Sequence, residues 1–309
     1  MAESGFSGVL VPVLTPFGRD LKPDANRFVA LCKGLLEAGA DGLAVFGTTS
    51  EANSMSAPER RELLERLVDA GVPAGKLMPG NGASALSEAA ENARHALKLG
   101  CGGVLMLPPF YYKAVTDDGL FDFYSAVIDR VGEASLRIYL YHIPPVAQVG
   151  IGYGLIERLI SAFPKTVVGL KDSSGDWENT RGMLERFPGF EIFVGSEAFL
   201  LQGMRHGARG TITAMGNINT AEIKQLYENW QGPNADSLQE HITAVRKVVQ
   251  SQPVIPAMKA LLARWTGDQT WATVRPPLRP VSQDVAAALD RELTAAGFRV
   301  PEVLSVATA

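Results

Sequence analysis

Short apolar runs alternate with longer amphipathic stretches along most of this 309-residue chain, and this alternation constrains the fold more than any other feature. Runs that are apolar throughout are typical of parallel strands buried on both faces. Strands that alternate with helices predict βαβ units. Eight such runs, rich in Val, Ile and Leu, are present: Gly8–Leu14, Gly42–Phe46, Leu77–Gly80, Gly102–Leu107, Leu136–Tyr141, Val167–Lys171, Glu191–Gly195 and Gly210–Thr213.

Helical patterns separate these runs and follow the last one. Three of the patterns come after a residue that can cap a helix, namely Asp24, Ser56 and Ser84. Four other signals are glycines at the expected helix ends: Gly39, Gly71, Gly100 and Gly207. The predicted helices are Arg27–Ala38, Arg60–Ala70, Leu86–Leu99, Asp117–Val131, Tyr153–Phe163, Asp176–Phe187, Ala198–His206 and Ala221–Trp230.

Eight strands and eight helices predict an α/β fold, a closed (β/α)8 TIM barrel over residues 1–232. An open doubly wound sheet is the alternative architecture. After Gly232 the strand pattern stops, and Ala235–Gln250, Pro253–Trp265 and Ser282–Ala296 read as helices joined by Pro-rich connectors. Residues 233–309 are therefore predicted to form a C-terminal helical appendage rather than a second barrel.

The balance of charged residues limits the classes of partner that this chain can bind. The 29 Lys and Arg residues nearly balance the 33 Asp and Glu residues, and no basic run is present. We therefore expect small-molecule partners, and neither nucleic acid nor an anionic membrane.

The longest uncharged stretch is broken by Pro108 and Pro109 and is shorter than the roughly 20 apolar residues of a spanning helix. No signal peptide is visible, Cys32 and Cys101 are predicted to be buried thiols, and a cytoplasmic location is expected.

Lys171 is the polar residue that stands out at a predicted strand end, where active-site groups of such barrels lie. Burial disfavours the charged form of a lysine, and the resulting free amine can attack a ketone carbonyl to give a Schiff base. The alternative is a lysine at the barrel rim that pairs with Asp172 or with a helix C-terminus. Tyr141 ends the neighbouring strand and could move the protons that this chemistry needs, or it could simply pack in the core.

The segment Gly47-Thr48-Thr49-Ser50-Glu51 follows the second strand and offers backbone N–H groups and hydroxyls in a tight turn. Such a turn can bind the carboxylate of a 2-keto acid beside the attacking amine. It could instead cap the helix that begins near Pro58. No Walker or Rossmann glycine motif is present, and the four histidines lack metal-ligand spacing, so neither a nucleotide cofactor nor a metal is expected. His142 is expected to be a supporting hydrogen-bonding residue.

These residues stand in motifs that resemble a known family, the pyruvate-type class I lyases that include dihydrodipicolinate synthase and N-acetylneuraminate lyase. The resemblance covers essentially Gly5 to Arg264. Its motifs are GTTSE at Gly47–Glu51, PPFYYK at Pro108–Lys113, YHIPP at Tyr141–Pro145, GLKDSSGD at Gly169–Asp176, GSE at Gly195–Glu197 and GTIT at Gly210–Thr213.

The resemblance implies a role for each matching residue. Lys171 would form the Schiff base with a 2-keto acid such as pyruvate, and Tyr141 would transfer protons above it. Thr48 and Thr49 would hold the carboxylate. Tyr111 would be lent across a dimer interface to complete a relay with Thr49 and Tyr141. The family is typically a homotetramer, a dimer of dimers, and needs no cofactor beyond the covalent bond. The remaining substrate contacts fall on Gly195, Glu197, Ile212 and Val146.

Two departures from the family pattern limit the substrate. Dihydrodipicolinate synthases usually carry an arginine where this chain has Val146, and its loss removes a contact worth about 1.5–3 kcal/mol to the carboxylate of aspartate semialdehyde. Sialic acid lyases usually have an acidic pair where this chain has only Glu197. We therefore predict an aldolase or dehydratase for a 2-keto-3-deoxy sugar acid or a related 4-hydroxy-2-keto acid. The alternatives are dihydrodipicolinate synthase itself and a non-catalytic barrel that binds a keto acid.

Overall fold

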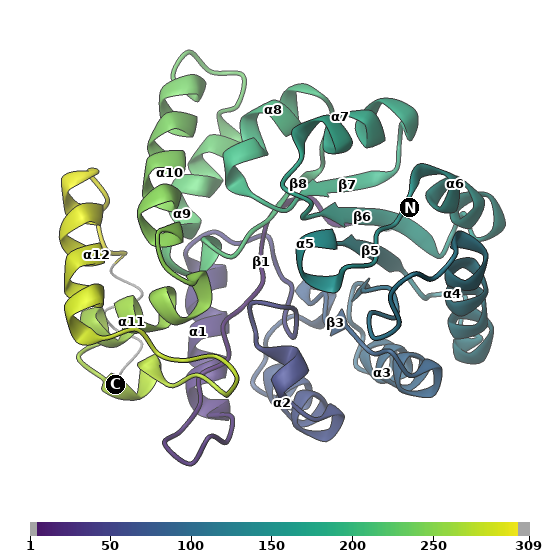
Figure 1. The fold of residues 1–309 in the computed structure, drawn as a ribbon, viewed down its shortest axis with the longest axis horizontal. Helices are drawn as coiled ribbons and strands as arrows, with labels where there is room; N and C mark the ends of the chain where they lie inside the picture. Colours follow the sequence, from purple (N-terminus) through teal and green to yellow (C-terminus); the bar gives the residue numbers. More distant parts are fainter. Residues whose placement is uncertain (1–4, 302–309) are drawn as a thin grey trace.

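Eight parallel strands form one curled sheet in the computed structural model, which describes residues 5–301 (Figure 1). The sheet order is β2-β1-β8-β7-β6-β5-β4-β3, and a parallel bridge between Leu43 and Leu77 joins its two edges. The (β/α)8 barrel predicted from the sequence is thereby confirmed. The strands are β1 (Gly8–Val11), β2 (Gly42–Leu43), β3 (Gly80–Asn81), β4 (Val104–Met106), β5 (Ile138–His142), β6 (Val167–Asp172), β7 (Glu191–Val194) and β8 (Gly210–Ile212).

Several strands are shorter than their apolar runs. The run Gly42–Phe46 forms regular pairing only over Gly42–Leu43, and Phe46 has a φ of 60°, which a continuing strand does not allow. Near the start of the next run, Leu77 pairs with Leu43 of β2, whereas Gly80 and Asn81 pair with β4. Buried apolar sequence thus extends beyond the hydrogen-bonded ladder, because loop segments at the barrel rim are buried as well.

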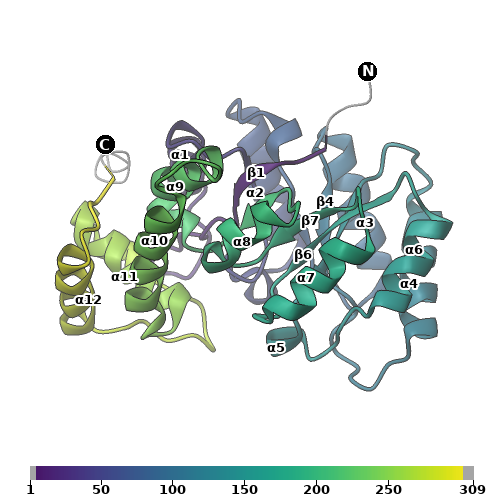
Figure 2. The same ribbon diagram turned by 90° about the horizontal axis from the view of Figure 1, so that it is seen from above.

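The helices surround the sheet (Figures 1 and 2). They are α1 (Ala25–Glu37), α2 (Ala57–Asp69), α3 (Leu86–Lys98), α4 (Asp117–Val131), α5 (Pro144–Ala147), α6 (Tyr153–Ala162), α7 (Trp177–Arg186), α8 (Leu200–Arg205), α9 (Gly216–Glu228), α10 (Ala235–Gln250), α11 (Val254–Thr266) and α12 (Gln283–Ala295). The short helix α5 was not predicted. The helix predicted from Ala221 begins five residues earlier and bends at Asn219, whose backbone is not helical.

The predicted helix starts are right in two cases and wrong in one. Asp24 caps α1 by accepting a hydrogen bond from the Arg27 N–H, and Ser56 and Glu59 form a reciprocal capping box on α2. Ser84 does not cap α3; its hydroxyl accepts from the backbone N–H of Tyr111 instead. A loop of the same barrel end competes for this serine, which the local sequence does not reveal.

Two apolar layers make up the core. The outer layer lies between the strands and the helices and includes the buried Cys32 and Cys101 thiols. Burial raises the pKa of the Cys101 thiol to about 12. The inner layer fills the barrel with the side chains of Leu10, Ala44, Met78, Leu105, Leu107, Tyr139, Tyr141, Ile143, Ala147, Phe193 and Ile212. The barrel is therefore a packed core, and chemistry is confined to the ends of its strands.

The last three helices lie together on one side of the barrel in both views (Figures 1 and 2). The helix α10 packs on α8 and α9, and α11 packs on α9 and α12. The predicted boundary at residue 232 falls between α9 and α10, but the division into domains 1–232 and 233–309 stays a prediction. Residues 1–4 and 302–309 of those domains lie outside the described residues. None of the helices in residues 5–301 is long and apolar enough to cross a membrane.

The capping assignments predict different stabilities for two serine variants. Ser56→Ala removes the hydroxyl that accepts from the Glu59 N–H, although the backbone N–H of residue 56 can still donate to the Glu59 carboxylate, and should lower the free energy of unfolding by about 1 kcal/mol. Ser84→Ala is the matched control and should stay within about 0.5 kcal/mol of the wild type, because this serine caps no helix. Urea unfolding followed by circular dichroism measures both values, and equal losses would contradict the assignment.

Candidate active site

The side chains of Lys171 and Tyr141 meet inside the barrel. Strands β5 and β6 are parallel neighbours, and their register places Tyr141 directly beside Lys171. The Lys171 Nζ lies 3.3 Å from the Tyr141 Oη and 4.4 Å from the centre of its ring. Each residue is only 4% exposed. An amine and a phenol within hydrogen-bond distance, shielded from water, form a pair suited to nucleophilic attack and proton transfer.

Asp172 follows Lys171 in the chain but faces the other side of the strand. Its carboxylate accepts hydrogen bonds from the Ser174 N–H at 2.9 Å and from the Thr180 hydroxyl at 2.7 Å. Successive residues of a strand point to opposite faces, so Asp172 orders the start of α7 while Lys171 points into the barrel. The alternative interpretation, a rim lysine paired with Asp172, does not describe this arrangement.

The hydroxyl turn at Gly47–Glu51 lies beside this pair. The Thr48 Oγ1 is 3.4 Å from the Tyr141 Oη, and both residues line one small cavity. Thr49 and Ser50 are buried, and the Ser50 hydroxyl donates to the carbonyl of Val13 at 2.5 Å. The structure thus places Thr48, rather than the predicted Thr49, in contact with the phenol.

Tyr111 and Val146 lie on the outside of the same barrel end. Tyr111 is 73% exposed on the loop between β4 and α4, and Val146 is 60% exposed on α5. The Lys113 ammonium ties the two segments together by donating to the Ala147 carbonyl at 2.9 Å. Within the described part of the chain, no hydrogen bond joins Tyr111 to Thr49 or Tyr141. A single chain therefore does not assemble the predicted relay.

The other predicted substrate contacts are more deeply buried. Ile212 belongs to the same inner apolar layer as Tyr141. Gly195 must be a glycine, because a Cβ there would lie 2.2 Å from the Ser173 Oγ and 2.5 Å from the Asp172 carbonyl oxygen. Glu197 is 1% exposed, and its Oε2 accepts from the Thr213 hydroxyl and from the Arg246 Nη1, whereas its Oε1 has no partner among residues 5–301.

His142, next to Tyr141, supports a loop. Its Nδ1 accepts a hydrogen bond from the Ile151 N–H at 2.9 Å, which requires an unprotonated Nδ1. Burial lowers the pKa of His142, and the nearby Asp172 carboxylate opposes this shift. The neutral imidazole therefore fastens the segment that leads into α6, which agrees with the supporting role expected from the sequence.

Sequence reasoning missed a buried ion pair behind the hydroxyl turn. Glu51 binds Lys259 of α11, and both side chains are fully buried. The available signal was Lys259 itself, the only charged residue between Val254 and Ala263 in an otherwise apolar helix. Long-range pairing of two charges cannot be inferred from either segment alone.

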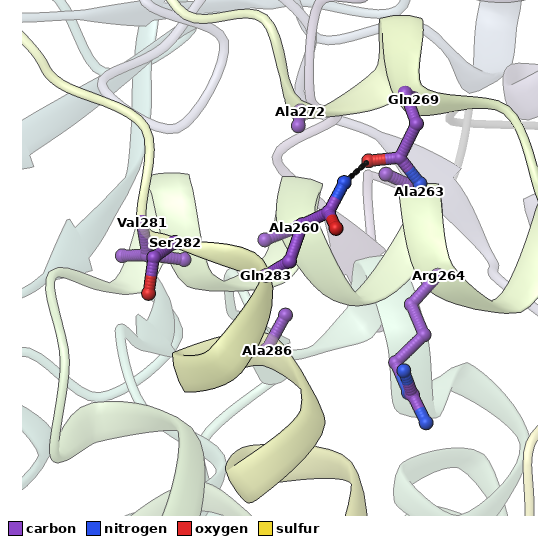
Figure 3. Close-up of a pocket in the computed structure, with 9 residues that line it drawn as sticks. All are labelled: Ala260, Ala263, Arg264, Gln269, Ala272, Val281, Ser282, Gln283 and Ala286. Atoms are coloured by element: carbon purple, nitrogen blue, oxygen red, sulfur yellow. Dashed lines mark hydrogen bonds between the residues drawn. The ribbon is translucent and has the colours of Figure 1, made fainter.

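Across residues 5–301, no group of three or more His, Cys, Asp or Glu side chains is placed to hold a metal ion. The cavity in Figure 3 lies among the C-terminal helices, between α11, the start of α12 and the turn that holds Gln269. Four of its nine lining residues are alanines, and a Gln283–Gln269 hydrogen bond of 3.0 Å crosses it. None of its lining residues lies on a barrel strand.

Comparisons with known proteins show the family to which this fold is related. A model of the dihydrodipicolinate synthetase family matches residues 5–296. The chain is 34% identical over 286 residues to an uncharacterized DapA-like lyase of Chloroflexus aurantiacus, covering 91% of this chain and 94% of the relative. It is 32% identical over 296 residues to a 4-hydroxy-tetrahydrodipicolinate synthase of Thermus thermophilus, covering 93% and 95%.

Solved structures show the same fold. The crystal structure of dihydrodipicolinate synthase from Agrobacterium tumefaciens has a TM-score of 0.88 and 32% sequence identity to this chain. The match covers 95% of this chain and 100% of that one. The similarity therefore extends through the barrel and through most of the C-terminal helices.

His142 should make the protein sensitive to acid. Its pKa in the fold lies below its ordinary value of 6.5, so the unfolded chain takes up a proton that the folded chain does not. Stability should be intact above pH 6.5 and fall as the pH drops through the lowered pKa. His142→Asn should lose less stability than the wild type between about pH 7 and about pH 5 in urea unfolding. Identical pH dependence in both proteins would refute this role.

Proposed function

This chain belongs to the dihydrodipicolinate synthetase family and is a lyase, and we propose that Lys171 forms a Schiff base with a 2-keto acid such as pyruvate. The observation that carries the proposal is the 3.3 Å contact between the Lys171 Nζ and the Tyr141 Oη inside the barrel. No charged partner competes for this amine among the described ion pairs, whereas a phenol that can accept or return a proton is in contact with it.

The reaction begins with attack of the Lys171 amine on the ketone carbon. The resulting carbinolamine loses its hydroxyl as water, which requires one proton to be delivered to the leaving oxygen. Tyr141 is placed to deliver it, and Thr48 is placed to take part in returning it because its hydroxyl is 3.4 Å from the phenol. The imine then acts as the electron sink. The C4 hydroxyl of the substrate gives its proton to the Tyr141 phenolate that the earlier proton delivery left behind, the C3–C4 bond breaks, and the C4 fragment leaves as an aldehyde. The bonding electrons form the enamine by neutralising the protonated imine.

The hydroxyl turn holds the carboxylate of the keto acid in this proposal. Thr48 and Thr49 follow β2, and backbone N–H groups of the same turn lie beside them. A carboxylate bound there stands next to the carbonyl that the amine attacks, so binding also aligns the reacting atoms. The covalent bond to Lys171 is the only linkage that this chemistry requires, and no further cofactor has a step in it.

Tyr111 enters the site of a second subunit in this proposal. Its ring stands at the barrel mouth, where it contacts Tyr112 edge to face with 5.3 Å between ring centres. Of the six large apolar side chains that are exposed within residues 5–301, four belong to this face: Tyr111, Tyr112, Val115 and Val146. An apolar surface of this kind favours association between copies of the chain. The homotetramer built as a dimer of dimers, which the family resemblance implies, is the assembly that we propose.

We infer that the substrate is a 2-keto-3-deoxy sugar acid or a related 4-hydroxy-2-keto acid, and that the reaction is aldol cleavage or dehydration. Val146 supports this substrate class because a valine cannot bind a second carboxylate. The similarity to 4-hydroxy-tetrahydrodipicolinate synthases favours a second candidate, the condensation of pyruvate with aspartate semialdehyde. The two candidates share the formation of the Schiff base at Lys171 and differ in the bond that is made or broken next to it.

Borohydride trapping tests the Schiff base. Sodium borohydride added with pyruvate should reduce the imine and add the mass of the reduced pyruvate to the peptide that contains Lys171. Lys171→Met should take up no pyruvate on that peptide, and Tyr141→Phe should still bind pyruvate but form the adduct about a hundredfold more slowly or worse. If Lys171 stays unmodified in repeated trials, the Schiff-base mechanism is wrong. Binding of keto acids without trapping would favour a non-catalytic barrel.

Val146 provides a test of the substrate class. Val146→Arg should raise kcat/KM for the condensation of pyruvate with aspartate semialdehyde by about tenfold, because one charge-assisted hydrogen bond is worth at least that factor. Val146→Met is the matched control, since it adds length without charge and should leave this rate unchanged. A wild-type rate with the semialdehyde that exceeds the rate with every keto-deoxy sugar acid would instead support the second candidate.

A further inference from the structure

Glu51, the last residue of the hydroxyl turn, has a backbone conformation that few residues adopt. Its φ is 56° and its ψ is 32°, in the left-handed region that favours glycine. A non-glycine residue is kept in this region only where its surroundings hold it firmly. The contacts of the Glu51 side chain therefore bear on the shape of the whole turn.

Those contacts all come from the C-terminal helical region. The Lys259 ammonium, on α11, binds the Glu51 Oε1, and the Arg275 N–H donates to the Oε2 at 2.8 Å. Lys259 also donates to the Thr273 carbonyl at 2.9 Å and lies 4.4 Å above the centre of the Phe17 ring. Both charged side chains are fully buried. The carboxylate is thus held at both oxygens by a part of the chain that contributes no strand to the barrel.

The turn itself is short and closed, so a displacement of Glu51 must move its neighbours. The Glu51 N–H donates to the Thr48 carbonyl at 3.0 Å, and the N–H groups of Ser50 and Ala52 donate to the Gly47 carbonyl at 3.1 and 3.3 Å. Thr48 in turn lies 3.4 Å from the phenol of Tyr141. A continuous chain of contacts therefore runs from α11 through Glu51 to the phenol.

Because they are buried, the charges of Glu51 and Lys259 depend on each other. Burial lowers the pKa of Lys259 to about 8, and the opposing attraction of Glu51 keeps the ammonium charged at neutral pH. A buried charge that loses its partner is strongly unfavourable, whereas removal of both charges is tolerated much better.

We propose that Glu51 and Lys259 are positioning residues, through which the C-terminal helical region fixes the turn that binds the carboxylate of the keto acid. The inference rests on the proposed function, since it assigns a purpose to a contact behind the same site. Neither residue touches the reacting atoms. Their effect is on how well Thr48 and Thr49 are placed before the substrate arrives.

The pyruvate concentration that gives half-maximal borohydride trapping distinguishes a positioning role of Glu51 and Lys259 from a merely structural one. Lys259→Met should raise the pyruvate concentration for half-maximal trapping by about tenfold while the plateau of labelled Lys171 stays near that of the wild type. Partial unfolding would lower the plateau and leave the half-saturation unchanged. The matched control is Lys224→Met, which breaks the Lys224–Asp41 ion pair of 2.7 Å at the other end of the barrel and should leave both values unchanged.

A double variant covers the case in which Lys259→Met does not fold. Glu51→Gln with Lys259→Met leaves no unpaired buried charge, and it should fold and still show half-saturation raised about fivefold or more. Half-saturation within about twofold of the wild type in a folded variant overturns the positioning role while the proposed function stands. If the wild type itself traps no pyruvate, the proposed function fails, and the positioning role fails with it.

Discussion

The contact between the Lys171 amine and the Tyr141 phenol depends on one constraint, the parallel pairing of β5 and β6 in a register that sets these two residues side by side. Each strand end carries one of the groups, and the alternation of side chains along a strand turns both into the barrel. The residue after Lys171, Asp172, then faces the helices and orders α7. A shift of one residue in this register would turn Asp172 into the barrel and Lys171 toward the helices. The packed side chains inside the barrel fix the register, and the chemistry therefore depends on them.

The rest of the molecule places a second set of groups around that pair. The turn after β2 sets Thr48 beside the phenol, and the C-terminal helices hold the far end of this turn through Lys259 and Arg275. Four exposed apolar side chains, Tyr111, Tyr112, Val115 and Val146, lie at the mouth of the barrel. The barrel thus supplies the reacting groups, whereas the added helices and a neighbouring subunit are proposed to complete the binding of the substrate.

The sequence predicted the barrel and the central pair because both depend on local patterns. Apolar runs marked the strands, and Lys171 and Tyr141 were visible as polar groups at strand ends. Predictions that needed contacts between distant segments did less well. Ser84 looks like a helix cap but binds the Tyr111 N–H, and Thr48 rather than Thr49 reaches the phenol. The Glu51–Lys259 pair joins positions 208 residues apart, and no spacing rule connects them.

The central claim is that Lys171 becomes covalently bonded to the substrate. A crystal structure of the wild-type protein soaked with pyruvate tests it most directly. We expect continuous electron density from the Lys171 Nζ to the ketone carbon, with the pyruvate carboxylate against Thr48 and Thr49. Pyruvate bound elsewhere, or bound at the barrel mouth with the Lys171 amine left free, would contradict it.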